Sequence, residues 1–265
     1  MDNESSTEPI RIVLYATEVG SLLGLNCYCS RTEVVKRAWY RLEKDEVPQC
    51  FRPRPDLLKA IRNTKAGYKF RRQKYTIENY RAFNGLVSEL QEALKNEDHP
   101  ELVESASGFV RTEMGTNSEM LAIDIAEANP EIGQCRSMQQ KFSRLAWGSQ
   151  DGKVEVVISG CIDCRDHEGR IVEIKTRLGR QPGVTATELA QLNTYLFLTG
   201  ATAGYIVELY DGDKLIINPF FAFDKNWWDD EVIPALISFA NDVTTSIKAK
   251  ALVILHDIPF DDAWD

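Results

Sequence analysis

The sequence lacks the features that several common protein classes require. It contains only three histidines, so we do not expect a metal site built from imidazole ligands. No apolar run approaches the ~20 residues of a membrane span, and the first residues contain no apolar core of a signal peptide. A glycine-rich phosphate loop and an internal repeat are also absent. We therefore expect an intracellular protein, in the cytoplasm or nucleus, without a membrane partner.

Cysteines are present but do not form a recognisable framework. The six cysteines are not spaced like those of a secreted disulfide scaffold. Cys161 and Cys164 form a C-x-x-C motif, but no second pair stands at zinc spacing, and no cysteine follows Cys164. We expect structural or incidental cysteines rather than metal or iron–sulfur ligands.

The chain also lacks net positive charge, which constrains any interaction with nucleic acid. Its 265 residues, 43% of them hydrophobic, can bury a sizeable core, but the formal charge is -9. The segment 48–81 is the exception, because it has ten Lys and Arg against Asp56 and Glu78, with interleaved aromatic residues. Such a segment, with Arg71, Arg72 and Lys74 at its centre, is typical of contact with backbone phosphates. A solvated charged face is the alternative interpretation.

The stretch from Gly160 to Arg177 carries the chemistry. It reads as two strands joined by a polar turn at 167–169, with Asp163 near the end of the first strand. Because alternate side chains of a strand share a face, Glu173 and Lys175 point one way and Ile174 the other. If the strands pair, Asp163 approaches Glu173, so two carboxylates and an ammonium share one small site.

That combination suits hydrolysis of a phosphodiester. Two hard oxygen anions can hold Mg²⁺, which acidifies a bound water. Lys175 can orient that water or stabilise the charge that builds on the phosphorus centre. The alternative is a surface hairpin with an ordinary ion pair. In the loop that follows, Arg177 and Arg180 are both able to touch phosphates.

Three helices flank this stretch in the sequence. Thr17 is predicted to cap a helix that begins at Glu18, and Glu119 lies in a helix entered through Gly115. Thr185 and Glu188 form a capping box for a third helix, which contains Gln191. The pattern predicts an α/β fold with a central mixed sheet of four or five strands flanked by helices. Its strands are expected near 154–163, 170–176, 203–209 and 215–221.

Five pieces in this order resemble the λ-exonuclease-like (YqaJ) branch of the PD-(D/E)XK nuclease superfamily. They are ATEVGSLLGLN, GTNSEMLAIDIAE, GCIDCRD, VEIKTR and AQLNTYLFLTG. The resemblance covers the chain from about Ala16 to about Ala251, apart from the basic segment. It implies a restriction-endonuclease-like core in a single domain, 10–255, with a basic helical insertion at about 48–100 and an acidic tail, 256–265.

The resemblance also implies roles for individual residues. Asp163, Glu173 and the helix-borne Glu119 would be metal ligands, assisted by the carbonyl of Ile174, and Lys175 would be the catalytic lysine. Gln191 would arrange the site or the DNA. Thr17 stands where the family often has a serine near a 5′-phosphate pocket, whereas Ile162 replaces the family's proline before the aspartate.

The expected activity is therefore that of a Mg²⁺- or Mn²⁺-dependent DNA exonuclease, acting 5′ to 3′ on duplex ends in recombination or repair. The resemblance implies duplex DNA and its single-stranded product as partners, a single-strand annealing protein beside it, and a homo-oligomer such as a ring trimer. A viral origin fits it too, since phage members are known. A structure-specific endonuclease of the same superfamily and an inactivated nuclease fold that binds DNA or protein remain as alternatives.

Overall fold

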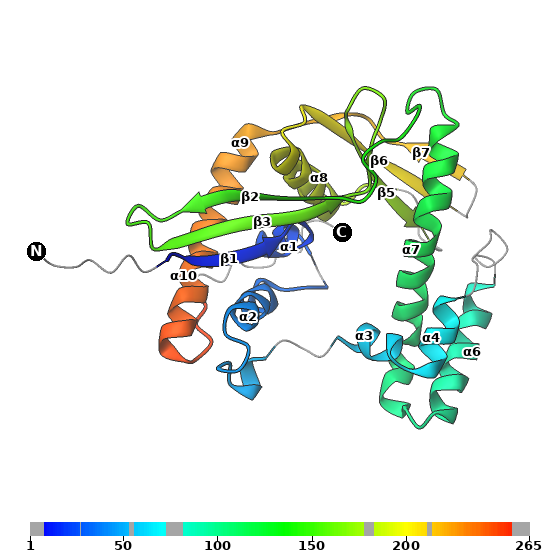
Figure 1. The fold of residues 1–265 in the computed structure, drawn as a ribbon, viewed down its shortest axis with the longest axis horizontal. Coiled ribbons are helices and arrows are strands. Elements are labelled where there is room, and N and C mark those ends of the chain that lie inside the picture. The colour runs from blue at the N-terminus through cyan, green and yellow to red at the C-terminus, as the bar shows by residue number, and fades with distance from the viewer. Residues whose placement is uncertain are drawn as a thin grey trace, which may run out of the picture.

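The computed structural model describes residues 8–26, 28–52, 56–72, 82–177, 183–210 and 214–255. It is an α/β fold in which mixed β-sheets are flanked by helices (Figure 1). The predicted fold class is confirmed. The predicted single sheet, however, is divided into two, and the division falls where the sequence places the candidate chemistry.

The first sheet has the strand order β1-β3-β2. Its strands are β1 (Ile10–Tyr15), β2 (Gln140–Gly148) and β3 (Val154–Ile162). β1 runs parallel to β3, whereas β2 pairs with β3 antiparallel through the turn at Asp151-Gly152. Alternate residues such as Ile12 and Ile158 are fully buried on one face.

The second sheet has the order β4-β5-β6-β7, with β8 also on β6. Its strands are β4 (Cys164–Arg165), β5 (Ile171–Arg177), β6 (Ala203–Tyr210), β7 (Lys214–Ile217) and β8 (Phe221–Ala222). β5 and β6 are parallel neighbours and are joined through α8 (Ala186–Thr199). Both strands are buried along most of their length, as expected for a parallel pair with helices on each face.

Helices cover one face of the first sheet and both faces of the second. They include α1 (Ala16–Leu22), α2 (Arg31–Leu42), α9 (Lys225–Trp227), the π-helical turn η3 (Trp228–Val232) and α10 (Ile233–Ala249). α1, α8 and α10 share a core with the inner face of the first sheet. On the second sheet, α8 packs against one face and α7 (Ala106–Glu127) against the other. The predicted capping box of α8, Thr185 with Glu188, is present, and Gly200 ends the helix in the left-handed conformation.

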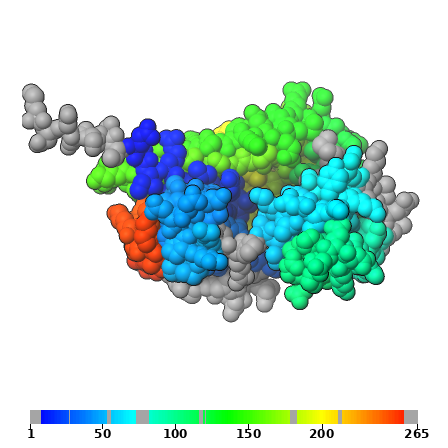
Figure 2. Space-filling view, turned by 60° about the horizontal axis from the view of Figure 1, so that its bottom comes forward, coloured from blue at the N-terminus to red at the C-terminus, as the bar shows by residue number. Residues whose placement is uncertain are grey.

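The segment between α2 and α7 forms short helices with a core of their own. They are η1 (Gln49–Phe51), α3 (Leu57–Arg62), α4 (Lys65–Arg71), α6 (Phe83–Asn96) and η2 (Pro100–Ser105). Leu90, Leu94 and Ile61 pack here against Phe109 and Val110 of α7. Figure 1 shows α3, α4 and α6 around the lower half of α7, and Figure 2 shows them as part of a cyan-to-green lobe beside the blue surface that includes α2.

Several predicted boundaries differ from those of the structure. β1 and β2 were not among the predicted strands. β2 is exposed over most of its length, so its sequence lacks the apolar alternation that marks a half-buried strand. The helix predicted from Gly115 begins nine residues earlier, at Ala106, because Phe109 and Val110 anchor its first turns in the helical core.

No helix in the described ranges is long and apolar enough to cross a membrane.

Candidate functional site

The candidate site lies at the point where the two sheets diverge. β3 ends at Ile162 in the first sheet, and Cys164 begins β4, which pairs with β5 in the second. Asp163 stands between them. Its Oδ2 accepts a 2.7 Å hydrogen bond from the backbone N–H of Ile174 in β5. The fork therefore brings the carboxyl of Asp163 to the strand that carries Glu173 and Lys175.

Glu173 and Lys175 lie on the same face of β5, as their spacing predicts. Lys175 Nζ is 2.7 Å from Glu173 Oε1 and 3.1 Å from Gln191 Oε1 of α8. The amide nitrogen of Gln191 donates to Glu173 Oε1 at 2.9 Å and to the hydroxyl of Tyr195 at 2.9 Å. α8 thus supplies a polar side chain that fixes the positions of both charged groups.

The electrostatics of the site are unusual for carboxyl groups. Asp163 is 7% exposed and Glu173 only 2%. Burial raises the pKa of Glu173 to about 8; the negative charge of Asp163 adds to the shift, and Lys175 opposes it. Burial also raises the pKa of Asp163 to about 7, and the next cause is the nearby carboxylate of Glu119. The carboxyl of Asp163 therefore feels the charge of Glu119, and that of Glu173 feels the charge of Asp163. We call Glu119, Asp163, Glu173 and Lys175 the carboxylate cluster.

Lys175 keeps its proton in this surrounding. Burial favours its neutral form, but the charge and hydrogen bond of Glu173 outweigh burial and raise the pKa of Lys175. The protonated amine of Lys175 therefore lies beside the carboxyls.

The carboxylate cluster fits a divalent cation. Glu173 Oε2 is buried and has no hydrogen-bond partner among the described residues. The neighbouring carboxyl of Asp163 could become its partner only if one of the two carboxyls carries a proton. Three ionised carboxylates and one ammonium leave a formal charge of −2, and carboxylate oxygen is the ligand that Mg²⁺ and Mn²⁺ prefer. Within the described ranges, no three His, Cys, Asp or Glu side chains are already arranged around a metal position. The carboxylate cluster therefore suits a divalent cation through its carboxylate oxygens and its net negative charge, not through a coordination geometry preformed among the described residues.

The sequence also predicted DNA-contacting residues, and the structure places these elsewhere. Arg177 is buried and forms ion pairs with Glu188 and Glu208, so it is not presented to a nucleic acid as predicted. Its place in β5, two residues after Lys175, turns it inward on the same face. Arg180 and Lys74 lie outside the described residues.

Thr17 does not cap α1. The helix begins at Ala16, and the side chain of Glu18 accepts a 3.0 Å hydrogen bond from the backbone N–H of Tyr15. Glu18 is itself held by Arg41 at 2.9 Å. Thr17 is an exposed residue of the first turn, two positions after the N-cap residue Tyr15.

In the basic segment, as at Arg177, some of the arginines form ion pairs within the protein. Arg71 contacts the buried carboxylate of Glu113 at 3.2 Å, and Arg62 pairs with the same group. Arg72 donates a hydrogen bond to the hydroxyl of Tyr68 and lies over its ring. Arg71 and Arg72 are nevertheless exposed. Part of the predicted patch therefore holds the helical segment to α7.

One residue of the site was given no role from sequence. Tyr195, one helical turn after Gln191, accepts the hydrogen bond that orients the Gln191 amide. Its spacing of four residues puts it on the same stripe of α8, which was visible in the sequence, but only the structure shows that the hydroxyl meets the amide.

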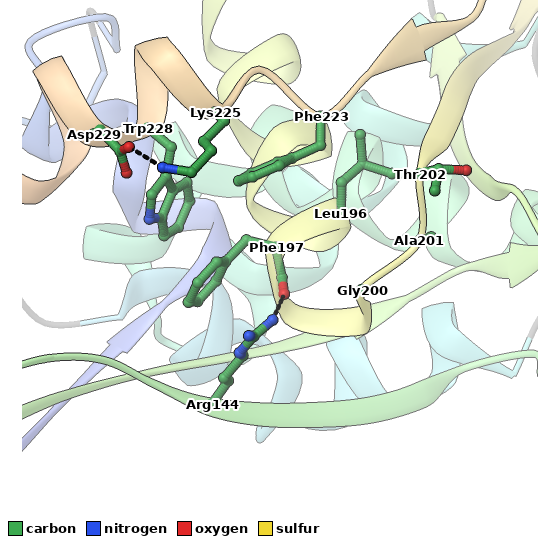
Figure 3. A pocket seen from close by; sticks show the side chains of 10 residues that line it. All are labelled: Arg144, Leu196, Phe197, Gly200, Ala201, Thr202, Phe223, Lys225, Trp228 and Asp229. Carbon is green, nitrogen blue, oxygen red and sulfur yellow. Dashed lines mark hydrogen bonds and ion pairs between the residues drawn. The ribbon is translucent and has the colours of Figure 1, made fainter.

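An open surface pocket lies away from the carboxylate cluster. It has a volume of about 520 Å³ and lies at the C-terminal end of α8 (Figure 3). Phe197 stacks on Trp228 with ring centroids 4.1 Å apart, and Arg144 of β2 donates to the Phe197 carbonyl at 2.6 Å. Lys225 and Asp229 form an ion pair at its rim. None of the predicted catalytic residues lines it.

Comparison with protein-family models gave no match, and comparison with curated proteins gave none. A search of solved structures found a likeness to the crystal structure of SSO0001, with a TM-score of 0.41 and 13% sequence identity. The match covers 74% of this chain and 91% of the other. A likeness at this level carries no argument about function.

Proposed function

We propose that this chain is a metal-dependent deoxyribonuclease that hydrolyses phosphodiester bonds at the carboxylate cluster. The supporting observation is the meeting of Asp163, Glu173, Glu119 and Lys175 where the two sheets diverge. Buried carboxyls with raised pKa values beside a protonated lysine are typical of catalytic sites.

Each residue has a part that its contacts suggest. Asp163, Glu173 and Glu119 supply the oxygen ligands. A Mg²⁺ or Mn²⁺ ion bound there would polarise a phosphoryl oxygen and lower the pKa of its bound water. The ammonium of Lys175 can orient the attacking water or stabilise negative charge on the phosphate. Gln191, held by Tyr195, keeps Lys175 and Glu173 at a fixed separation.

The finer assignment rests on the resemblance to λ-exonuclease-like (YqaJ) nucleases. We propose that the enzyme is an exonuclease that degrades duplex ends 5′ to 3′ during recombination or repair. On the same ground we propose that it works beside a single-strand annealing protein and as a homo-oligomer, such as a ring trimer.

Degradation of labelled DNA tests this function. The substrates are linear duplexes with and without a 5′-phosphate and a covalently closed circle, each incubated with and without Mg²⁺ or Mn²⁺. We expect degradation of the linear duplexes only, and only with the metal. Asp163→Ala and Lys175→Ala should each lower the rate by ~100-fold or more. Lys153→Ala, which changes an exposed lysine far along the β2–β3 hairpin, is the matched control.

The remaining outcomes separate the alternatives. Degradation of the closed circle would identify an endonuclease. DNA binding without cleavage under any metal condition would favour an inactivated nuclease fold. Cleavage that is the same in Lys175→Ala as in the wild type would remove the carboxylate cluster from the mechanism.

A further inference from the structure

A second basic stretch lies next to the carboxylate cluster and was not singled out in the sequence. Residues 132–150 contain Arg136, Lys141 and Arg144 but no Asp or Glu, in a chain of formal charge -9. The stretch contains β2, the edge strand of the first sheet, which is exposed along most of its length.

The side chains of β2 divide between two faces. Phe142 packs on the core and Arg144 contacts Phe197, so these even-numbered positions face the helices. The odd-numbered positions face outward. Lys141 stands opposite Cys161 of β3, and Ser143 stands opposite Ser159.

The outward face is polar near the fork of the sheets and apolar farther along. The hydroxyls of Ser143 and Ser159 are 2.9 Å apart, and the next outward residue, Leu145, is 52% exposed. The described helices α1, α8 and α10 pack on the opposite face. Near the fork, the outward face of β2 therefore presents Lys141 and the hydroxyl of Ser143 to the solvent.

The turn before β2 is tied to the carboxylate cluster. The backbone N–H of Gln139 donates to the carbonyl of Asp163 at 3.0 Å, and its side-chain oxygen accepts from Cys161 Sγ at 3.5 Å. Ser137 and Gln139 both have positive φ, 54° and 53°. Since such backbone is strained for these residues, surrounding contacts must hold the turn, and Met138 at its tip is 47% exposed.

Lys141 lies close to the carboxylate cluster along the strand pair. It stands directly opposite Cys161, which is two residues before Asp163 in the chain. Because Gln139, two residues before Lys141, donates a hydrogen bond to the carbonyl of Asp163, the exposed lysine lies beside the strand end that carries this carboxyl.

We propose that the outward face of β2 and the turn at 137–139 bind the backbone of the DNA strand whose phosphodiester lies at the carboxylate cluster. Lys141 contacts a phosphate adjacent to the scissile one, and the Ser143–Ser159 hydroxyls donate hydrogen bonds farther along the strand. Met138 offers an apolar surface to the bases. This inference rests on the proposed function, because it assigns the substrate contacts of that site.

The salt dependence of DNA binding tests the assignment. Binding of a labelled duplex is measured from 50 to about 300 mM salt, with EDTA so that cleavage does not interfere, for the wild type, Lys141→Gln and Lys153→Gln. Lys153 lies at the other end of the same hairpin and is 73% exposed, so it controls for the loss of one charge. We expect Lys141→Gln to weaken binding several-fold and to reduce the slope of log K on log salt by roughly 0.9. Lys153→Gln should leave the slope unchanged.

Two results would overturn the proposal in different ways. If the wild type cleaves DNA with Mg²⁺ but Lys141→Gln and Lys153→Gln bind with the wild-type slope, the contact surface is wrong and the proposed function stands. If the wild type neither binds nor cleaves DNA, the proposed function fails and this inference fails with it. Unchanged thermal unfolding of Lys141→Gln confirms that the variant is folded.

Discussion

Two buried groups of charges share β5 and α8, yet they are built differently. The first is the carboxylate cluster, and the second, the Arg177 cluster, consists of Arg177, Glu188 and Glu208. Glu173 and Lys175 of the first cluster and Arg177 of the second lie on the face of β5 that α8 covers.

In the Arg177 cluster every charge finds a partner. Arg177 contacts Glu188 through Nη1 at 2.7 Å and also pairs with Glu208. Glu208 further accepts hydrogen bonds from the backbone N–H of Gly183 at 3.0 and 3.1 Å and from the Asn218 amide at 3.1 Å. Burial alone would raise the pKa of Glu208, but these donors lower it.

The carboxylate cluster shows the opposite balance. The pKa values of Asp163 and Glu173 are raised, to about 7 and about 8, and Glu173 Oε2 is unpaired among the described residues. Breaking a compensated buried cluster is costly because it leaves a buried charge without a partner, whereas an uncompensated cluster is costly until it gains a cation or a proton. Under the proposed function, the Arg177 cluster is structural and the carboxylate cluster is the metal-binding site.

The largest effect should come from breaking the compensated cluster. Arg177→Met leaves Glu208 buried without its cation and should lower the free energy of unfolding by about 3–5 kcal/mol, measured by urea denaturation. Arg11→Met, at an exposed pair with Glu155, should change it by less than about 1 kcal/mol. A small loss in Arg177→Met would mean that the cluster tolerates an unpaired carboxylate, and the contrast between the clusters would fail.

The sequence could predict the alternation along β5 but not the partners across space. The two-residue period places Glu173, Lys175 and Arg177 on one face, and this is what the structure shows. The local sequence pattern does not show that Lys175 contacts Glu173, whose second oxygen has no partner among the described residues, or that Arg177 contacts Glu208. The register of β5 against β6 places Glu208 beside Lys175, yet Glu208 pairs with Arg177, and only the structure shows this. Phosphate contact by Arg177 was therefore predicted wrongly.

The fold shows the same division between local and tertiary information. The cap of α8 follows from side-chain chemistry and was predicted. The separation into two sheets was not, because it depends on β1 inserting beside β3, more than 140 residues later in the chain. β2 escaped prediction because an exposed edge strand needs no apolar face.

A smaller effect of opposite sign is expected at the carboxylate cluster. In Glu173→Gln the side-chain oxygen can still accept from Lys175 and Gln191, and the new amide can donate to Asp163 where Oε2 has no partner. Without metal, the variant should be more stable than the wild type by about 2 kcal/mol at pH 8.

Metal should reverse this order. Millimolar Mg²⁺ or Mn²⁺ should raise the melting temperature of the wild type, because a ligand that binds only the folded state stabilises it, but not that of Glu173→Gln. If Glu173→Gln destabilises the metal-free protein, or if metal stabilises both proteins equally, Glu173 is a structural residue like Glu208.

The last prediction concerns how stability depends on pH. The pKa of Glu173 is about 8 and that of Asp163 about 7 in the folded protein, both above their usual values. Below about pH 4 these groups are protonated in both the folded and the unfolded state, so they do not lower the free energy of unfolding. As the pH rises toward 8 the unfolded chain loses their protons while the folded protein retains them, so stability falls.

Glu188 and Glu208 act in the other direction. Their pKa values are lowered in the folded protein, so both groups stabilise the folded state at pH values above the usual pKa of a glutamate. This stabilisation is lost as the pH falls through their folded-state pKa values. Thermal unfolding of the metal-free wild type should therefore show maximal stability near pH 5 and a decline toward pH 8. The decline should be shallower in Glu173→Gln and should disappear with saturating Mg²⁺, because the metal replaces the retained protons. If the decline is the same in Glu173→Gln and in the wild type with saturating Mg²⁺, other groups cause it. The carboxylate cluster would then be no different from the Arg177 cluster.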